Sequence, residues 1–130
     1  DVLGSRGLGD VYKRQIYEAY GGLQNDGIML AVYYDVDAAK IIHQLDSWEK
    51  INDSPTISSI LKNVSSYFGL DFVIPEIASG NFFLYDNSQH KELRSEAEMN
   101  TLLLHSEDVN FSLVVWDDEK HTIYIVEYRI

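Results

Sequence analysis

The stretch that decides the fold is FSLVVWDDEKHTIYIVEYRI, residues 111–130. Its two apolar halves, Phe111–Trp116 and Thr122–Ile130, flank the polar residues Asp117-Asp118-Glu119-Lys120. Two alternating runs on either side of a short polar turn predict an antiparallel β-hairpin. Alternate positions of its second strand point to opposite faces. One face carries Tyr124, Val126, Tyr128 and Ile130, and the other carries Glu127 and Arg129.

Upstream of the hairpin, helical and strand patterns follow one another irregularly. The most regular helical spacing begins after Ser54-Pro55 and continues to Phe68, where Gly69 ends it. Ser95 and Glu98 form a capping box that opens a further helix to about His105. The remaining expected elements are a helix end at Ile16–Tyr20, a helix over Ala38–Ile51, and strands at Ile28–Tyr34, Phe72–Ile74 and Phe82–Tyr85.

This order of elements predicts the fold class. Strands and helices do not alternate regularly, which argues against a doubly wound parallel sheet. We expect an α+β fold with an antiparallel or mixed sheet of four to five strands. About three helices pack on it, and the chain ends in a C-terminal β-hairpin.

Residues 1–15, DVLGSRGLGDVYKRQ, differ from the rest of the chain. The segment resembles the conceptual translation of a sequencing adaptor, carries three of the eight glycines and lacks an apolar period. We expect it to be a non-native leader. Residues 16–130 are then a single acidic α+β domain that has lost residues from its natural N-terminus.

Composition excludes several classes of function. The net charge of −11 disfavours nucleic-acid phosphates and anionic membranes as partners and favours a basic protein. The chain has no cysteine, which excludes thiol catalysis, disulfides and cysteine-ligated metals. No apolar run reaches the 18 or so residues of a membrane helix. We expect a small soluble domain in the reducing cytoplasm.

Two carboxylates stand where the strand Ile28–Tyr34 gives way to a helix. Asp35 and Asp37 are spaced to ligate Mg²⁺ through oxygen, as in some hydrolases and transferases. The same residue type caps helix N-termini by accepting hydrogen bonds from free amides. The sequence favours capping and keeps a metal site as the alternative.

The hairpin turn supplies the candidate partner-binding residues. Asp117, Asp118 and Glu119 suit a turn, and their charge suits a cation or a basic partner. Trp116 and Tyr128 are large amphipathic side chains of the type that protein interfaces use. If this turn lies beside Asp35 and Asp37, a shared acidic surface results.

The histidines indicate neither a metal site nor catalysis. His43, His90, His105 and His121 lack metal-ligand spacing, and each is expected at the surface. We expect no cofactor.

Three functions remain open. The first is a non-catalytic acidic binding module of the inhibitor, immunity or phage-antagonist type that engages a basic protein. The second is a metal-dependent hydrolase or transferase fragment using Asp35 and Asp37. The third is an accessory or structural domain of a longer protein, for which an exposed apolar patch is expected. The oligomeric state is left open.

Overall fold

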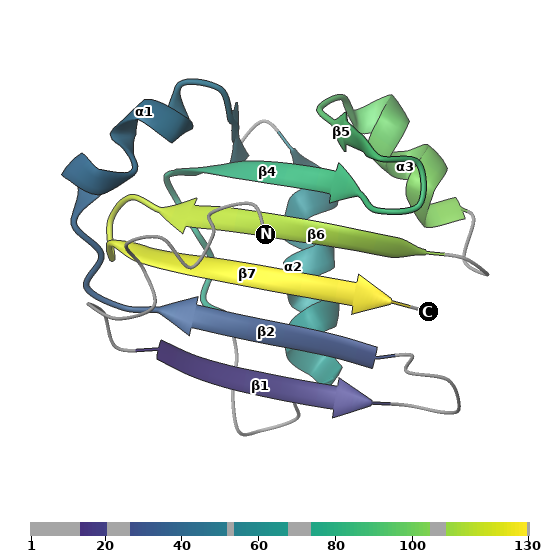
Figure 1. The fold of residues 1–130 in the computed structure, drawn as a ribbon, viewed down its shortest axis with the longest axis horizontal. Coiled ribbons are helices and arrows are strands. Elements are labelled where there is room, and N and C mark those ends of the chain that lie inside the picture. The colour runs from purple at the N-terminus through teal and green to yellow at the C-terminus, as the bar shows by residue number, and fades with distance from the viewer. Residues whose placement is uncertain (1–13, 21–26, 52–53, 68–73, 105–108, 130) are drawn as a thin grey trace.

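The computed structural model describes residues 14–20, 27–51, 54–67, 74–104 and 109–129 (Figure 1). These residues form one antiparallel sheet of seven strands with helical segments on both faces. The elements in chain order are β1 Arg14–Tyr20, β2 Gly27–Tyr33, η1 Ala38–Lys40 (a 3₁₀ turn), α1 Ile42–Leu45, β3 Glu49–Lys50, α2 Pro55–Tyr67, β4 Gly80–Asp86, β5 Lys91–Leu93, α3 Glu96–Leu104, β6 Asn110–Asp117 and β7 Thr122–Arg129.

The C-terminal hairpin lies at the centre of the sheet. The strand order is β1-β2-β7-β6-β4-β3, and β5 also pairs with β4. In the hairpin, β6 and β7 pair from Asn110 opposite Arg129 to Asp117 opposite Thr122. The strand β7 then pairs along its whole length with β2, and β6 pairs with β4. The predicted hairpin and the predicted α+β class are both confirmed.

The inner face of the sheet carries the main core. The strand residues Leu30, Leu113 and Val126 are fully buried there against Ile57 and Val64 of α2. Figure 1 shows α2 crossing behind the strands. Burial of apolar area contributes about 25 cal/mol per Å², so we expect this cluster, the larger of the two, to contribute more to stability than the cluster on the outer face.

The outer face, which is opposite α2, carries a smaller cluster at one end of the sheet. Trp116 of β6 and Ile123 of β7 are completely buried there. Val36, Ile41 and Trp48, which come from the segment around η1 and α1, close over them. The sheet is therefore covered on both sides at the end where β2 finishes and the hairpin turns.

Helix α3 begins at the predicted capping box. The backbone amide of Glu98 donates to the Ser95 hydroxyl at 3.1 Å, and the Glu98 carboxylate accepts from the Ser95 amide at 3.2 Å. Glu96 ties α3 to the start of α2, because its carboxylate accepts hydrogen bonds from Ser54 and Thr56. The capping box lies as the sequence predicted.

The expected helix over residues 38–51 is wrong. It is replaced by η1, the four-residue α1 and the strand β3. Trp48 packs in the outer cluster and Ile51 in the inner core. Residues three apart lie on the same side of a helix, so one helix cannot deliver these two side chains to opposite faces of a sheet. The chain instead crosses the sheet edge as β3.

The expected helix end at Ile16–Tyr20 is also wrong, because these residues belong to β1. All seven residues of β1 pair with β2, from Arg14 opposite Tyr33 to Tyr20 opposite Gly27. Five residues are too few for periodicity to separate helix from strand, and pairing with β2 decides. The sheet therefore has more strands than the four to five expected.

Other predictions fall partly outside the described residues. The expected strand Phe72–Ile74 is one of these: Phe72 and Val73 are not described, and Ile74 is buried in the inner core without being in a strand. Residues 1–13 of the predicted leader also lie outside. In the part of the chain that is described, no helix has the length and apolar character needed to cross a membrane.

Candidate functional site

Two acid-bearing loops meet at the end of the sheet where β2 finishes. The backbone amide of Val36 donates a hydrogen bond of 2.9 Å to the carbonyl oxygen of His121. Asp35, which precedes Val36, and His121 itself both have left-handed backbone conformations, with φ of 55° and 49°. The connection 34–37 and the turn 117–121 thus form one surface, which we call the acidic loop end.

The turn between β6 and β7 is held by Asp117. The Asp117 carboxylate accepts hydrogen bonds from the amides of Glu119 and Lys120 at 3.0 and 3.2 Å. The backbone amide of Asp118, the residue that follows Asp117, donates a hydrogen bond of 3.0 Å to the carbonyl oxygen of Ser79. Asp117 is only 2% exposed, so this predicted partner residue serves as the internal cap of the turn.

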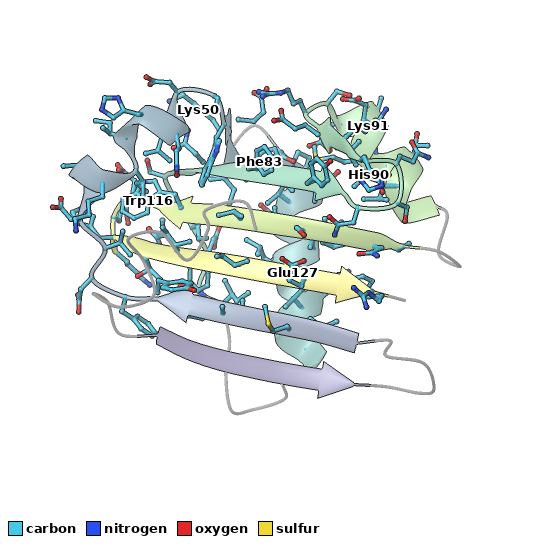
Figure 2. The ribbon with its side chains drawn as sticks, in the orientation of Figure 1. Lys50, Phe83, His90, Lys91, Trp116 and Glu127 are labelled. Atoms are coloured by element: carbon cyan, nitrogen blue, oxygen red, sulfur yellow. The ribbon has the colours of Figure 1, made fainter. Side chains whose placement is uncertain are left out.

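Trp116 lies beneath the turn. Its indole N–H donates to the Asp118 carboxylate at 3.3 Å, and its ring stacks on His121 with centroids 5.6 Å apart. The side chain is fully buried, and Figure 2 shows it at the same end of the sheet as the turn. Trp116 therefore supports the acidic loop end from below and presents no surface of its own.

Asp37 performs the capping that the sequence favoured. Its carboxylate accepts a hydrogen bond of 3.0 Å from the amide of Ala39 at the start of η1. Asp35 is exposed beside it. Among the described residues, no three histidine or acidic side chains are grouped closely enough to hold a metal. The two-carboxylate Mg²⁺ site stays a prediction.

Tyr128 lies apart from the other predicted partner residues. It is near the end of β7 that is distant from the turn, and its ring stacks on Phe111 with centroids 5.0 Å apart. It is half-buried against the inner core. The structure thus brings Asp35, Asp37, Asp118 and Glu119 together and leaves Tyr128 at the opposite end of the sheet.

The exposed charges of the acidic loop end are predominantly negative. Its exposed carboxylates are those of Asp35, Asp37, Asp118 and Glu119, and its exposed cation is Lys120. A further lysine, Lys40, follows in η1. Below them, burial together with the nearby Asp117 and Tyr34 raises the pKa of Tyr124 to about 12, so its phenol stays neutral.

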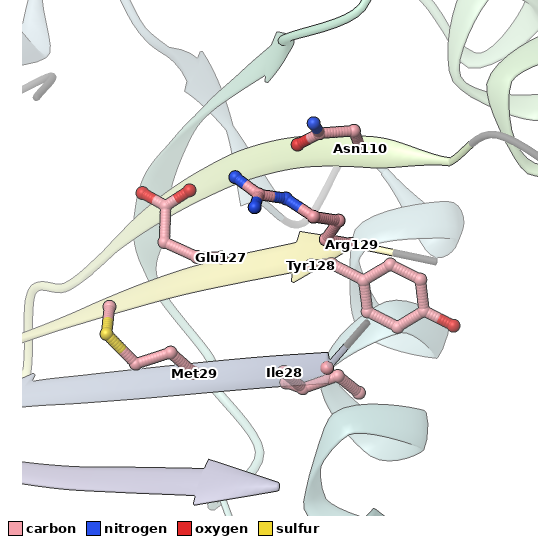
Figure 3. Close-up of a pocket in the computed structure, with 7 residues that line it drawn as sticks. Ile28, Met29, Asn110, Glu127, Tyr128 and Arg129 are labelled. Atoms are coloured by element: carbon pink, nitrogen blue, oxygen red, sulfur yellow. The ribbon is translucent and has the colours of Figure 1, made fainter. Parts of the chain in front are cut away.

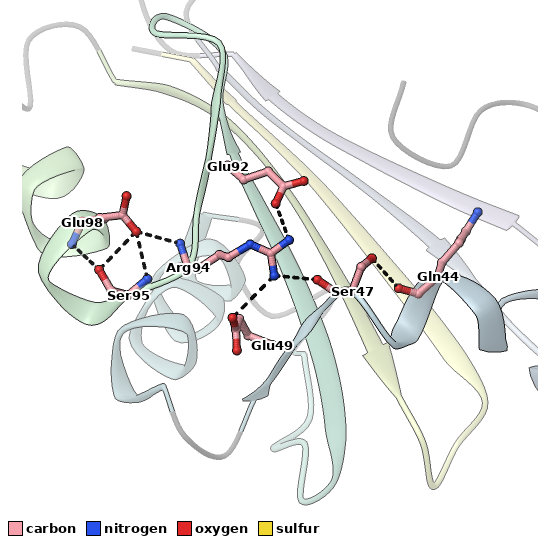
Figure 4. Close-up of polar contacts among 7 residues, drawn as sticks. All are labelled: Gln44, Ser47, Glu49, Glu92, Arg94, Ser95 and Glu98. Atoms are coloured by element: carbon pink, nitrogen blue, oxygen red, sulfur yellow. Dashed lines mark hydrogen bonds and ion pairs between the residues drawn. The ribbon is translucent and has the colours of Figure 1, made fainter.

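Acidic residues near β5 are organised differently, around Arg94 (Figure 4). Its guanidinium contacts the carboxylates of Glu92 at 2.5 Å and Glu49 at 3.5 Å, and it donates to the carbonyl of Ser47 at 2.7 Å. Hydrogen bonding to Glu92 raises the pKa of Arg94 against the opposing effect of burial. These contacts join the end of β5 to β3 at the edge of the sheet. The carboxylates of Glu92 and Glu49 are therefore already paired with the Arg94 guanidinium.

Comparison with protein-family models, with curated proteins and with solved structures found no match. The candidate site therefore rests on the geometry of this chain alone.

Three of the four histidines can be placed. His43, His90 and His121 are exposed, as expected, and His105 lies outside the described residues. Among residues 27–51, 54–66, 74–102 and 109–129, whose burial the structure describes, Ile42 is the large hydrophobic residue that stands exposed, at 53%. An exposed apolar patch of the kind expected of an accessory domain is not seen among these residues.

A polar network on the outer face was missed by the sequence analysis. The Ser112 hydroxyl donates to the Glu127 carboxylate at 2.5 Å, and the Asn87 amide donates to Asn110 and to Ser112, both at 3.0 Å. The sequence signal that could have indicated this network is a polar residue, Ser112 or Glu127, at an outward-facing position of each hairpin strand. Since Ser112 pairs with Glu127 in the register, their contact follows once that register is known.

Proposed function

We propose that this chain is a non-catalytic binding domain whose acidic loop end engages a basic protein. The observation that carries the proposal is the hydrogen bond from Val36 to His121, because it joins two acid-bearing loops into one surface. Asp35, Asp118 and Glu119 are the exposed carboxylates that we expect to contact the partner.

The overall charge supports this class of partner. At −11, the chain attracts basic surfaces over long range and repels phosphate backbones and anionic membranes. Charge complementarity of this kind accelerates encounter and selects the partner more than it adds raw affinity. We therefore expect fast, salt-sensitive association.

The hydrogen bonds that hold the two acid-bearing loops in place also support a binding function. Backbone hydrogen bonds from Val36 and Asp118 hold the connection and the turn, and the Asp117 carboxylate holds the turn from within. A surface already ordered before contact loses less conformational entropy when it binds. Rigid acidic loops on a β-sheet are a suitable arrangement for an inhibitor, immunity protein or phage antagonist. The absence of cysteine agrees with the cytoplasm, which is part of the proposal.

The test is a pull-down with the full chain as bait beside an unrelated protein of equal negative charge. Washes at low salt and at about 0.15 M salt separate general attraction from a specific interface, because the Debye length falls to about 8 Å. We expect one basic protein to remain on this chain alone after the second wash. Identical sets of proteins on both baits, all released by salt, would contradict the proposal.

A further inference from the structure

A second feature lies at the opposite end of the sheet, far from the turn between β6 and β7. A cavity of about 290 Å³ opens there across β2, β7 and β6 (Figure 3). Among the described residues, its lining is Gly27, Ile28, Met29, Asn110, Glu127, Tyr128 and Arg129. Pockets for drug-sized ligands begin at roughly 300 Å³, so this one suits a compact molecule of amino-acid size.

The polar groups of the cavity are held by the network on the outer face. Ser112 is 7% exposed, and its hydroxyl fixes one oxygen of Glu127, Oε2. The amide of Asn87 fixes Oδ1 of Asn110. Considering only the side chains of 27–51, 54–66, 74–102 and 109–129, these contacts leave Glu127 Oε1 as an acceptor and Asn110 Nδ2 as a donor toward a ligand.

Arg129 supplies a cation on the same face. It lies two residues from Glu127 on β7, and in the sheet it stands between Asn110 of β6 and Gly27 of β2. Since Gly27 has no side chain, room is left beside the guanidinium. Figure 3 shows the guanidinium extending back along β7 toward Glu127. Within residues 27–51, 54–66, 74–102 and 109–129, whose side chains the structure describes, Arg129 takes part in none of the ion pairs.

We propose that this cavity binds a free α-amino acid with an apolar side chain. The ligand carboxylate meets the Arg129 guanidinium and the Asn110 amide, as guanidinium–carboxylate pairing favours. The ligand ammonium meets Glu127, and the side chain lies against Met29, which is opposite Glu127 on the same face of the sheet. The site is separate from the acidic loop end, so it stands or falls independently of the proposed protein-binding function.

Three probes that share one side chain test the charge requirement: L-leucine, L-leucinamide, which lacks the carboxylate, and N-acetyl-L-leucine, which lacks the ammonium. Each is titrated to about 10 mM into the ¹⁵N-labelled full chain, and amide chemical shifts are followed. We expect L-leucine to bind about tenfold more tightly than either analogue, because each loses one charge-assisted contact. The shifts should centre on Met29, Asn110 and Glu127.

Two variants locate the contacts. Arg129→Gln and Glu127→Gln should each weaken L-leucine binding about tenfold. The glutamine at 127 still accepts the hydrogen bond from Ser112, which preserves the local structure. The matched controls Lys62→Gln and Glu76→Gln remove exposed charges elsewhere and should leave binding unchanged. Equal binding of all three probes, no binding by 10 mM, or unaltered binding in both site variants overturns the proposal.

Discussion

The backbone amide of Val36 and the carbonyl oxygen of His121 are joined by a hydrogen bond of 2.9 Å. The side chain of Val36 is 1% exposed and packs in the outer cluster with Trp116 and Ile123. The connection after β2 is therefore fixed to the central hairpin through both its backbone and its side chain. This relationship places Asp35 beside the turn that carries Asp118 and Glu119.

The close approach of β4 to β6 at the same end depends on Gly80. A Cβ atom at position 80 would overlap the carbonyl oxygen of Trp116, which is backbone and cannot rotate away. Gly80→Ala should therefore lower the free energy of unfolding by about 2 kcal/mol or more. Urea denaturation measures this. A loss below about 0.5 kcal/mol would contradict the packing described here.

Glu96 should give the fold an acid-sensitive component. Burial raises the pKa of its carboxyl, but the hydrogen bonds from Ser54 and Thr56 outweigh it and leave the pKa below its ordinary value of 4.5. A carboxyl with a lowered pKa stabilises the fold above the ordinary value, and this contribution is lost as pH falls below it. Because the side chain is half-buried, we expect about 1 kcal/mol.

Glu96→Gln should therefore be less stable than the native chain at pH 7 and approach it near pH 3. Urea denaturation across this range is the measurement, with Glu76→Gln as an exposed control. Parallel stability curves for the native chain and Glu96→Gln would show that the carboxylate does not contribute.

Tyr124 should limit stability in alkali. Its pKa is raised to about 12, so its contribution is complete below pH 10 and is lost as pH rises toward 12. Tyr124→Phe should flatten the decline in unfolding free energy between pH 9 and pH 11. Tyrosinate absorbance provides a second reading, because one of the nine tyrosines should ionise last. Uniform titration of all nine near pH 10 in the folded chain would contradict the prediction.

The metal alternative at Asp35 and Asp37 has a direct thermal test. A Mg²⁺ site with a Kd of about 1 mM would stabilise the fold by about 1.4 kcal/mol at about 10 mM Mg²⁺. Since Asp37 already caps η1, we expect no change in the melting temperature. A rise that Asp35→Asn abolishes would instead support the metal-dependent hydrolase or transferase.

Local sequence patterns predicted correctly those elements whose conformation depends on residues near them in the chain. The hairpin turn, the helix after Pro55 and the Ser95–Glu98 capping box are set by neighbouring residues. The strand β1 and the break between α1 and β3 depend on pairing and burial against distant residues. The spacing of apolar residues does not indicate that Trp48 packs on one face of the sheet and Ile51 on the other.

The candidate site was predictable in the same partial way. Asp118 and Glu119 were recognisable as turn residues, and Asp35 and Asp37 as candidate caps, of which Asp37 caps η1. The burial of Trp116 depended on the segment around α1 folding back over the outer face. The contact of Val36 with His121 joins main-chain atoms, so side-chain chemistry gave no sign of it.

The most direct test of the binding function compares two triple variants in the pull-down at about 0.15 M salt. Asp35→Asn, Asp118→Asn and Glu119→Gln together remove three charges from the acidic loop end and keep its hydrogen-bond acceptors. The control, Asp46→Asn, Glu76→Gln and Glu92→Gln, removes three exposed charges spread over separate elements. We predict that the retained basic partner falls about tenfold in the first variant and stays at the native level in the control. Equal retention by both variants would contradict the central claim that the acidic loop end is the binding surface.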